Sequence, residues 1–297
     1  MSFRVDIRKD IDDEPAEYTT DGKILAISDL EGDLPLMIEL LYWNGVINQD
    51  LDWVFGEGHL VVIGDVFDRG YDVTAMLWFI YQLEAEAEKD GGKVHLLMGN
   101  HEALVMAGDL TWARKKYLDL DLATGISTAE RLNGETLLGR WLRSKNTIER
   151  INNVLFVHGG IGEEYVAKGF TVENVNELVR ENIGYRDNII CAYDEEACFL
   201  FGLDGPLWYN GYFADDMTSA KVENILNYME AEKMVIGHSK VESVQSLFNN
   251  QIIAIDTHAD SKDDLNGVIS ESYCEGLLIE NGVYYKINNL GNKGELK

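Results

Sequence analysis

The sequence predicts an α/β layered fold, in which short apolar strands alternate with amphipathic helices. Two observations support this prediction. Short apolar runs recur along the chain with helical patterns between them, and no repeat period or proline-rich linker interrupts them. Five of these runs end directly in polar residues that can bind a ligand. In open α/β sheets, ligands bind just beyond the carboxyl ends of the strands.

The predicted elements follow one another in a simple order. We expect buried strands at residues 23–28, 59–64, 93–99, 154–157 and 233–237. Helices are expected at 34–44 and 71–89, in stretches running to 117, and around 137–145. The tail from 251 to 287 alternates apolar residues around Asn281-Gly282, which is typical of a β-hairpin. The sheets should therefore be of mixed direction, with antiparallel strands last.

The 297 residues are interpreted as a single domain, 1–297. Residues 1–22 are polar and are expected to form an N-terminal arm or an edge hairpin. Two stretches, 108–150 and 180–232, are expected to be helical insertions that shape the substrate surface. The three cysteines, Cys191, Cys198 and Cys274, form no C-x-x-C pair and are expected to be unpaired thiols.

The charge balance excludes some partners. The formal net charge of −27 argues against binding to nucleic acid or to an anionic membrane, because both require clustered Lys and Arg. It does not exclude an anionic substrate, since bound metal ions can dominate the local charge. The sequence contains no apolar stretch long enough to span a membrane and no secretion signal, so we expect a cytoplasmic protein.

Each of the five strands is followed by at least one residue of a type that can bind a metal. The polar residues at these strand ends are Asp29 and Glu31; Asp65, Asp68 and Arg69; Asn100, His101 and Glu102; His158; and His238. One such residue alone is more often a helix cap or a structural histidine. Five strand ends of this kind together suit two divalent ions bridged by a carboxylate.

At these positions the chain resembles the calcineurin-like metallophosphoesterases. The matching motifs are DLE, GDVFDRG, GNHE, VHGG and IGHS, which span residues 29–239. The DGPLWYNGYF stretch at 204–213 is most similar to bacterial Shewanella-like phosphatases of the phosphoprotein type. The resemblance implies a metallophosphoesterase-type β-sandwich of mixed sheets flanked by helices, with helical insertions.

The resemblance also implies the metal ligands. Asp65 would bridge two ions, because a carboxylate has two oxygens to share. The other implied ligands are Asp29 and Glu31 on the first ion, and Asn100, His158 and His238 on the second. Two such ions lower the pKa of a bridging water and so provide a hydroxide for in-line attack on phosphorus.

The catalytic residues implied by the resemblance are Arg69, His101 and Asp68. Arg69 has the planar fork that grips phosphate oxygens, and Asn100 and Asn210 would share in substrate binding. His101 would protonate the leaving alkoxide, and Asp68 would orient the imidazole and keep it cationic.

Two positions depart from the family pattern. Glu31 stands where the family carries a histidine, which makes the first ligand set all-oxygen and favours Mn²⁺, Fe or Mg²⁺ over Zn²⁺. Asn210 stands where relatives carry a second phosphate-binding arginine. Glu102 is expected to serve at the start of a helix rather than as a ligand.

The predicted function is a dimetal phosphatase that hydrolyses phosphomonoesters by attack of metal-bound hydroxide. Its substrate would be a serine/threonine phosphoprotein or a small phosphate ester. Two alternatives stay open, a diadenosine-polyphosphate or nucleotide hydrolase and a catalytically impaired metal-binding regulatory module. His258 could add a positive group at the rim of the site, whereas His59 and His95 at strand starts are expected to be structural.

Overall fold

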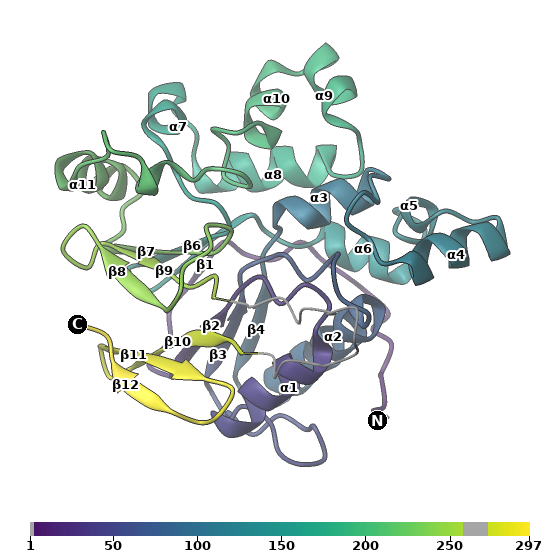
Figure 1. Cartoon of the computed structure of the whole chain (residues 1–297), viewed down its shortest axis with the longest axis horizontal. Helices are drawn as coiled ribbons and strands as arrows, with labels where there is room; N and C mark the ends of the chain where they lie inside the picture. Colours follow the sequence, from purple (N-terminus) through teal and green to yellow (C-terminus); the bar gives the residue numbers. More distant parts are fainter. Residues whose placement is uncertain (1–2, 258–272) are drawn as a thin grey trace, which may run out of the picture.

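Two six-stranded mixed sheets organise the computed structural model, which describes residues 3–257 and 273–297. One sheet has the strand order β12-β11-β10-β2-β3-β4, and the other has the order β1-β5-β6-β7-β9-β8 (Figure 1). The strands of the first sheet are β2 (Ile24–Ile27), β3 (His59–Val62), β4 (Lys93–Leu96), β10 (Glu275–Glu280), β11 (Val283–Asn288) and β12 (Lys293–Glu295). Those of the second are β1 (Glu17–Tyr18), β5 (Ile148–Ile151), β6 (Val154–Val157), β7 (Lys233–Ile236), β8 (Gln245–Leu247) and β9 (Ile252–Ala254).

Each sheet has a parallel centre and antiparallel neighbours. In the first sheet β2, β3 and β4 are parallel, and in the second β6, β7 and β9 are parallel. The β10–β11 hairpin turns at Asn281 and Gly282, which both adopt positive φ. Positive φ at both turn residues matches the right-handed twist of the strands, so the hairpin predicted from Asn-Gly is confirmed.

The two sheets pack face to face as a sandwich. Ala26 and Val61 from the first sheet share one buried cluster with Phe156 and Val235 from the second. The residues next to them along each strand belong instead to a larger cluster that includes the helices. Because side chains alternate across a strand, these continuous apolar runs bury one face against the other sheet and one against helices. The predicted fold class is confirmed.

Helices cover the outer faces of both sheets (Figure 1). Those beside the first sheet are α1 (Leu34–Trp43) and α2 (Val73–Lys89), followed by α3 (Asn100–Met106), α4 (Lys115–Thr124), α5 (Thr128–Arg131) and α6 (Leu137–Arg143). Those above the second sheet are α7 (Glu163–Lys168), α8 (Val172–Asn182), α9 (Asp187–Tyr193), α10 (Glu195–Phe201), the 3₁₀ turn η1 (Gly211–Phe213) and α11 (Ser219–Tyr228). No helix within the described ranges has the length and apolarity needed to cross a membrane.

The two expected insertions differ in character. The stretch 108–150 holds α4, α5 and α6, and its last residues already form β5. In α6 the side chain of Trp141 is fully buried, whereas α4 has no buried residue. The stretch 180–232 begins inside α8 and holds α9, α10, η1 and α11. In Figure 1, α4 and α5 project from the body beside α3 and α6.

The N-terminal segment is an extended arm rather than a hairpin. Its β1 pairs in parallel with β5, and ion pairs secure the residues before it. Arg8 lies 2.6 Å from Glu84 of α2, and Lys145 lies 2.8 Å from the same carboxylate. Glu14 binds Lys145 at 3.0 Å and Lys93 at 2.6 Å. Because Glu84 and Lys145 are almost fully buried, the arm contributes to the core's charge balance.

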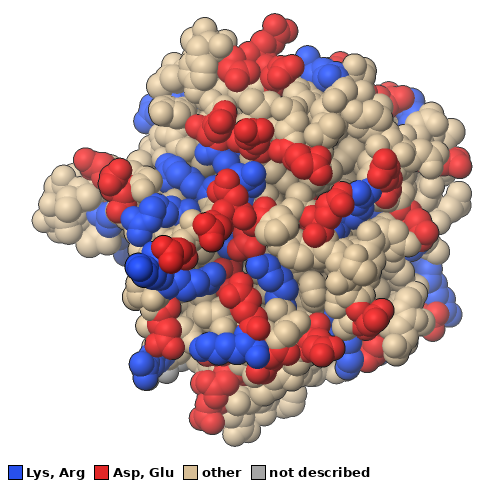
Figure 2. All heavy atoms as spheres, turned by 180° about the vertical axis from the view of Figure 1, so that it is seen from behind, with Lys and Arg blue, Asp and Glu red and all other residues tan. Residues whose placement is uncertain are grey.

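Charged side chains of both signs alternate over the rear of the molecule. Figure 2 shows Lys and Arg side chains lying among Asp and Glu side chains on that face rather than a uniformly acidic surface. On this face, therefore, acidic side chains lie close to basic ones, which offsets their charges locally.

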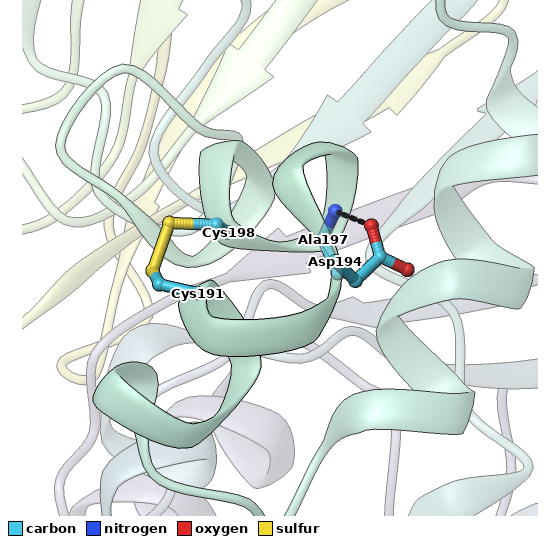
Figure 3. The surroundings of a disulfide bond; sticks show 4 residues. All are labelled: Cys191, Asp194, Ala197 and Cys198. Atoms are coloured by element: carbon cyan, nitrogen blue, oxygen red, sulfur yellow. Dashed lines mark hydrogen bonds between the residues drawn. A yellow bond between two sulfur atoms is a disulfide. The ribbon is translucent and has the colours of Figure 1, made fainter.

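The expectation of three unpaired thiols is wrong. Cys191 of α9 and Cys198 of α10 form a disulfide with a Cα–Cα distance of 4.6 Å (Figure 3). Seven residues of continuous helix would separate the two by about 10 Å. Asp194 breaks the helix with an extended backbone and caps α10 by accepting a hydrogen bond from Ala197 N at 2.9 Å. This reversal brings the sulfurs together, while Cys274 is a buried free thiol.

We expect Glu84→Gln to destabilise the protein strongly. The substitution keeps the side-chain shape but removes the buried counter-charge of Arg8 and one of the two carboxylates that pair with Lys145, which costs about 3–5 kcal/mol in free energy of unfolding. Urea denaturation measures this loss. Glu88→Gln is the matched control, because its ion pair with Lys93 is half exposed and contributes about 1 kcal/mol or less. Equal losses in the two variants would contradict a structural role for the buried pair.

Stability should also fall in acid through Glu14. Burial alone would raise the pKa of the Glu14 carboxyl, but Lys145 and Lys93 together lower it to about 2. A lowered folded-state pKa stabilises the native state above the ordinary value of 4.5, and this stabilisation disappears as the pH falls towards 2. Chemical denaturation from pH 6 to pH 2 should therefore show a smaller acid loss in Glu14→Gln than in the wild type. Identical pH profiles would refute the assignment.

Candidate active site

Six parallel strands, three from each sheet, end at the same edge of the sandwich. The residues at or just beyond their carboxyl ends are Asp29 after β2, Asp65 after β3, Asn100 after β4, His158 after β6, His238 after β7 and Asp256 after β9. Backbone bonds connect the sheets here, because Gly237 N donates to the His158 carbonyl and Asp29 N donates to the Gly64 carbonyl. The sandwich therefore assembles one polar cluster from both sheets.

The loops that present these residues are conformationally strained. The non-glycine residues of the cluster with φ between 46° and 69° are Asp29, Glu31, Asp65, Asp68, Arg69 and His238. Left-handed backbone costs a non-glycine residue on the order of 1–3 kcal/mol, and such residues gather at functional sites. This backbone conformation reverses the direction of the chain after each strand, which keeps the side chains near the polar cluster.

The first group of candidate ligands consists of Asp65, His158 and His238, whose donor atoms lie within 4.8 Å of one another. His158 Nε2 lies 3.3 Å from Asp65 Oδ2 and 2.9 Å from Asn100 Oδ1. His158 Nδ1 donates to the Ile63 carbonyl at 2.7 Å, which fixes the ring and leaves Nε2 to face the two oxygens.

The second group consists of Glu31, Asp65 and His101. Asp29 stands beside it, with Oδ2 accepting hydrogen bonds from Ser28 Oγ and, at 3.0 Å, from His238 N. A Cβ at Gly237 would come within 2.6 Å of that oxygen, so only glycine permits this approach. The structure thus brings together all six sequence-predicted metal ligands.

Glu31 also contacts a cation of the site. Its Oε1 forms an ion pair with Arg69 Nη1, and Arg69 Nη2 lies 3.5 Å from His101 Nε2. The carboxylate that replaces the family histidine therefore holds Arg69 over the cluster. The Arg69 side chain is 39% exposed, which leaves it accessible to a ligand arriving from solvent.

Asp68 and His101 form a tight pair. His101 Nδ1 lies 2.6 Å from Asp68 Oδ2, and Nε2 points towards Asp65 Oδ2 at 3.9 Å. Burial by itself would lower the pKa of His101, but the bond to Asp68 and the charge of Asp65 raise it. His101 is therefore held in one orientation and favours the protonated form.

Glu102 organises the backbone of the site. Its carboxylate accepts hydrogen bonds from the amides of Asp65 at 2.8 Å, Val66 at 2.7 Å and Gly99 at 2.7 Å. It lies in the first turn of α3 and is completely buried. As expected, Glu102 acts at a helix start, and it also ties the β3 loop to the β4 loop.

Asp256 belongs to the cluster and was missed by the sequence reasoning. It is 6% exposed, and burial followed by the charge of Glu31 raises its pKa to about 6. Asp256 also acts on Asp29. The pKa of Asp29 lies well above its ordinary value, because burial raises it and the charge of Asp256 raises it further. The signal was present, since the apolar run Ile252–Ala254 is followed by a carboxylate like the other strands.

Asn210 does not join the cluster. It is exposed at the start of η1, and within the described part of the chain no hydrogen bond links its side chain to the other candidate residues. Trp208 from the same stretch packs edge-on against His238, with ring centroids 5.7 Å apart. The Pro206 carbonyl accepts from Gly159 N at 2.8 Å. This stretch therefore shapes and supports the histidine side of the site.

The remaining histidines lie elsewhere. His59 and His95 bond to each other at 2.8 Å, and His95 bonds to Glu149 at 2.5 Å, all buried between the sheets as expected of structural residues. His258 lies outside the described residues.

The donor chemistry of the cluster fits divalent cations. Asp29, Glu31 and Asp65 are each at most 3% exposed, so their negative charges oppose one another with little help from solvent. Burial alone would lower the pKa of His158. The negative charges of Asp65 and Asp29 instead raise that pKa to about 10, because they stabilise a positive charge on the imidazole. Burial and His158 lower the pKa of His238 to about 4, which leaves a neutral imidazole available for metal binding.

A site of carboxylates, an amide and imidazoles at strand ends of a mixed sandwich defines a metal-dependent phosphoesterase. The sequence model described as calcineurin-like phosphoesterase matches residues 22–242, and the chain belongs to this family. It is therefore a hydrolase that acts on phosphoesters with divalent metal ions, and the resemblance inferred from its motifs is confirmed.

Several solved structures and curated proteins are similar to this chain. A cold-active protein tyrosine phosphatase of a psychrophilic Shewanella species is 37% identical over 96% of this chain and 83% of that chain, with a TM-score of 0.88. Shewanella-like protein phosphatase 1 of Plasmodium berghei is 28% identical over 80% of this chain and 67% of that protein. Shewanella-like protein phosphatase 2 of Arabidopsis thaliana is 26% identical over 79% and 70%. A serine/threonine phosphatase of Saccharomyces cerevisiae, 15% identical with a TM-score of 0.62, shares the fold.

We expect Asp256→Asn to weaken Mn²⁺ binding while stabilising the metal-free protein. The substitution removes a negative charge. That charge would attract a bound cation, but in the metal-free protein it is repelled by Asp29 and Glu31. Loss of such an outer partner lowers metal affinity about 10–100-fold. Calorimetric titration gives the affinity, and thermal unfolding with a chelator gives the stability. Asp216→Asn, on a side chain that is 85% exposed, is the control. Unchanged Mn²⁺ affinity in Asp256→Asn would remove Asp256 from the site.

Proposed function

We propose that the chain is a dimetal phosphomonoesterase that acts on phosphoproteins. The observation that carries this proposal is the position of Asp65, which belongs to both groups of candidate ligands. A carboxylate shared by two groups within bonding reach is what a bridged pair of ions requires.

The proposed ligand sets start from the two groups, add Asn100 to the first and Asp29 to the second, and leave His101 of the second group to act on the substrate. Asp65, Asn100, His158 and His238 would hold one ion, and Asp29, Glu31 and Asp65 would hold the other, with Asp256 adding negative charge nearby. When bound, the two ions would supply the charge that activates a water and offsets the negative phosphate. The oxygen-rich second set favours Mn²⁺, Fe or Mg²⁺ over Zn²⁺.

Arg69 and His101 would act on the substrate itself. Arg69 projects from the rim with both guanidinium nitrogens turned towards the site, so it can bind two phosphate oxygens once Glu31 engages a cation. His101 Nε2 would donate its proton to the leaving oxygen, because Asp68 holds the other ring nitrogen. Asp68 is thus a positioning residue, and His101 is the general acid.

The relatives support a proposal for the substrate class. The Shewanella relative that aligns with 96% of this chain is a cold-active protein tyrosine phosphatase. The exposed Asn210 brings no charge, so among the described site residues Arg69 would be the arginine that binds the phosphate beside the two ions. We therefore infer a phosphoprotein substrate, with phosphotyrosine favoured over phosphoserine and phosphothreonine.

Metal dependence and the bridging carboxylate provide the first test. Metal-stripped protein should hydrolyse p-nitrophenyl phosphate only after Mn²⁺ is restored. Asp65→Asn should lower kcat by at least about a thousandfold, because a neutral amide would offer the two ions one oxygen and no charge where the carboxylate would offer two oxygens and a negative charge. Asp72→Asn, outside the cluster, should keep full activity. Folded, metal-loaded protein without turnover of any phosphate ester would instead indicate the non-catalytic module.

Substrate choice is tested by comparing matched peptides. We expect kcat/KM for a phosphotyrosine peptide to exceed that for the same peptide with phosphothreonine by at least about tenfold. Phosphate release is measured for both peptides, and release of ADP, or of ATP and AMP, is measured for diadenosine tetraphosphate. Faster cleavage of the dinucleotide than of either peptide would overturn the phosphoprotein assignment in favour of nucleotide hydrolysis.

A further inference from the structure

Trp112 is an exposed aromatic side chain beside the arginine proposed to bind phosphate. It lies between α3 and α4, is 55% exposed, and is not among the described apolar residues that pack against the core. The Cζ atom of Arg69 lies 5.8 Å from the centroid of its ring. Arg69 Nη2 in turn lies 3.5 Å from His101 Nε2. One guanidinium group therefore connects the indole of Trp112 with the proposed general acid.

Hydrogen bonds hold the turn that carries Trp112 against the backbone of Arg69. Arg69 N donates to the Trp112 carbonyl at 3.1 Å, and Arg114 Nε donates to the Arg69 carbonyl. Within the turn, Ala113 N donates to the Leu110 carbonyl at 3.1 Å. Because this backbone is ordered before a substrate arrives, the indole can contact a substrate at a small further cost in conformational entropy.

The other aromatic side chains at the rim already have partners for their rings. Arg114 lies over the ring of Tyr71, with Cζ 4.8 Å from the centroid. Trp208 packs against the core and edge-on against His238. Arg69, by contrast, stands near the outer limit of about 6 Å for a cation–π contact, so it is not stacked on Trp112. The indole of Trp112 is thus the ring that remains available to a substrate among these three.

The position of His101 defines where the leaving group of a substrate would lie. His101 Nε2 is proposed to protonate the leaving oxygen, so the group bonded to that oxygen must lie next to His101 and Arg69. In phosphotyrosine this oxygen is bonded directly to an aromatic ring. In phosphothreonine it is bonded to an aliphatic carbon that carries only a methyl group and the backbone. Only the first of these leaving groups offers a face for stacking.

We propose that Trp112 is a specificity-determining residue whose indole stacks with the ring of a phosphotyrosine substrate. Aromatic rings with centroids about 4.5–7 Å apart attract each other beyond the effect of the area they bury. Arg69 would bind the phosphate while Trp112 contacts the ring one oxygen away. This inference rests on the proposed function, and it gives the preference for phosphotyrosine a physical cause in this chain's own residues.

The first test measures kcat/KM for two peptides of one sequence, with phosphotyrosine or phosphothreonine at the same position. Trp112→Ala should lower the value for the phosphotyrosine peptide about tenfold and change the value for the phosphothreonine peptide by about twofold or less. Trp112→Phe should keep most of the phosphotyrosine activity, because it retains an aromatic face. An equal loss for both peptides would overturn the proposal, since Trp112 would then act only by positioning Arg69. No loss for either peptide would overturn it as well.

Trp43→Ala is the matched control. Trp43 is 58% exposed, close to the exposure of Trp112, but it lies at the C-terminal end of α1. The ten residues of this helix place it about 15 Å from the loop that carries Glu31. Trp43→Ala should hydrolyse both peptides as the wild type does, and thermal unfolding establishes that each variant is folded. A selective loss of phosphotyrosine activity in Trp43→Ala equal to that in Trp112→Ala would overturn the proposal.

Binding of non-hydrolysable analogues separates this inference from the proposed function. Peptides with the phosphonate analogue of phosphotyrosine or of phosphothreonine are titrated calorimetrically into Mn²⁺-loaded wild-type and Trp112→Ala protein. A wild-type preference for the aromatic analogue that is lost in Trp112→Ala supports the stacking role, even in a protein that hydrolyses no phosphate ester. Equal binding of the two analogues by the wild type, or binding of neither, overturns the stacking role, even in a protein that is an active phosphatase.

Discussion

The mutual repulsion of four buried carboxylates is the constraint on which the rest of the site depends. Asp29, Glu31, Asp65 and Asp256 are each at most 6% exposed and lie at one edge of the sandwich. Such a cluster is unfavourable unless cations neutralise it. His158 and Arg69 supply part of this positive charge, and the donor set supplies the geometry for divalent ions. The same repulsion that destabilises the metal-free site thus creates its affinity for cations.

The packing of the two sheets brings these charges together. Neither sheet alone carries the site, because each contributes three parallel strand ends to the shared edge. The inter-sheet core fixes the two edges relative to each other, and Glu102 fixes two of the loops by binding their amides. The left-handed residues of the site keep their strained backbone because the surrounding packing and hydrogen bonds fix it.

Asp68 connects the site to the rest of the protein. One of its oxygens holds His101, while the residue as a whole borders a pocket lined also by residues of the weakly packed α4. The catalytic acid is thereby separated from the α4–α5 region by a single carboxylate. Insertions that appear peripheral in the sequence can in this way reach the reacting groups without touching the substrate.

The sequence by itself determined the strand-end residues, because local apolar runs and the polar residues after them need no tertiary information. Only the tertiary structure decided what depends on distance between remote segments. Asp256 joins Asp29 because β9 lies beside β7, and Glu31 faces Arg69 because two strained loops turn towards each other. Likewise Cys191 meets Cys198 only because the helix breaks at Asp194. Spacing along the chain fixes which residues are available, whereas packing fixes which of them meet.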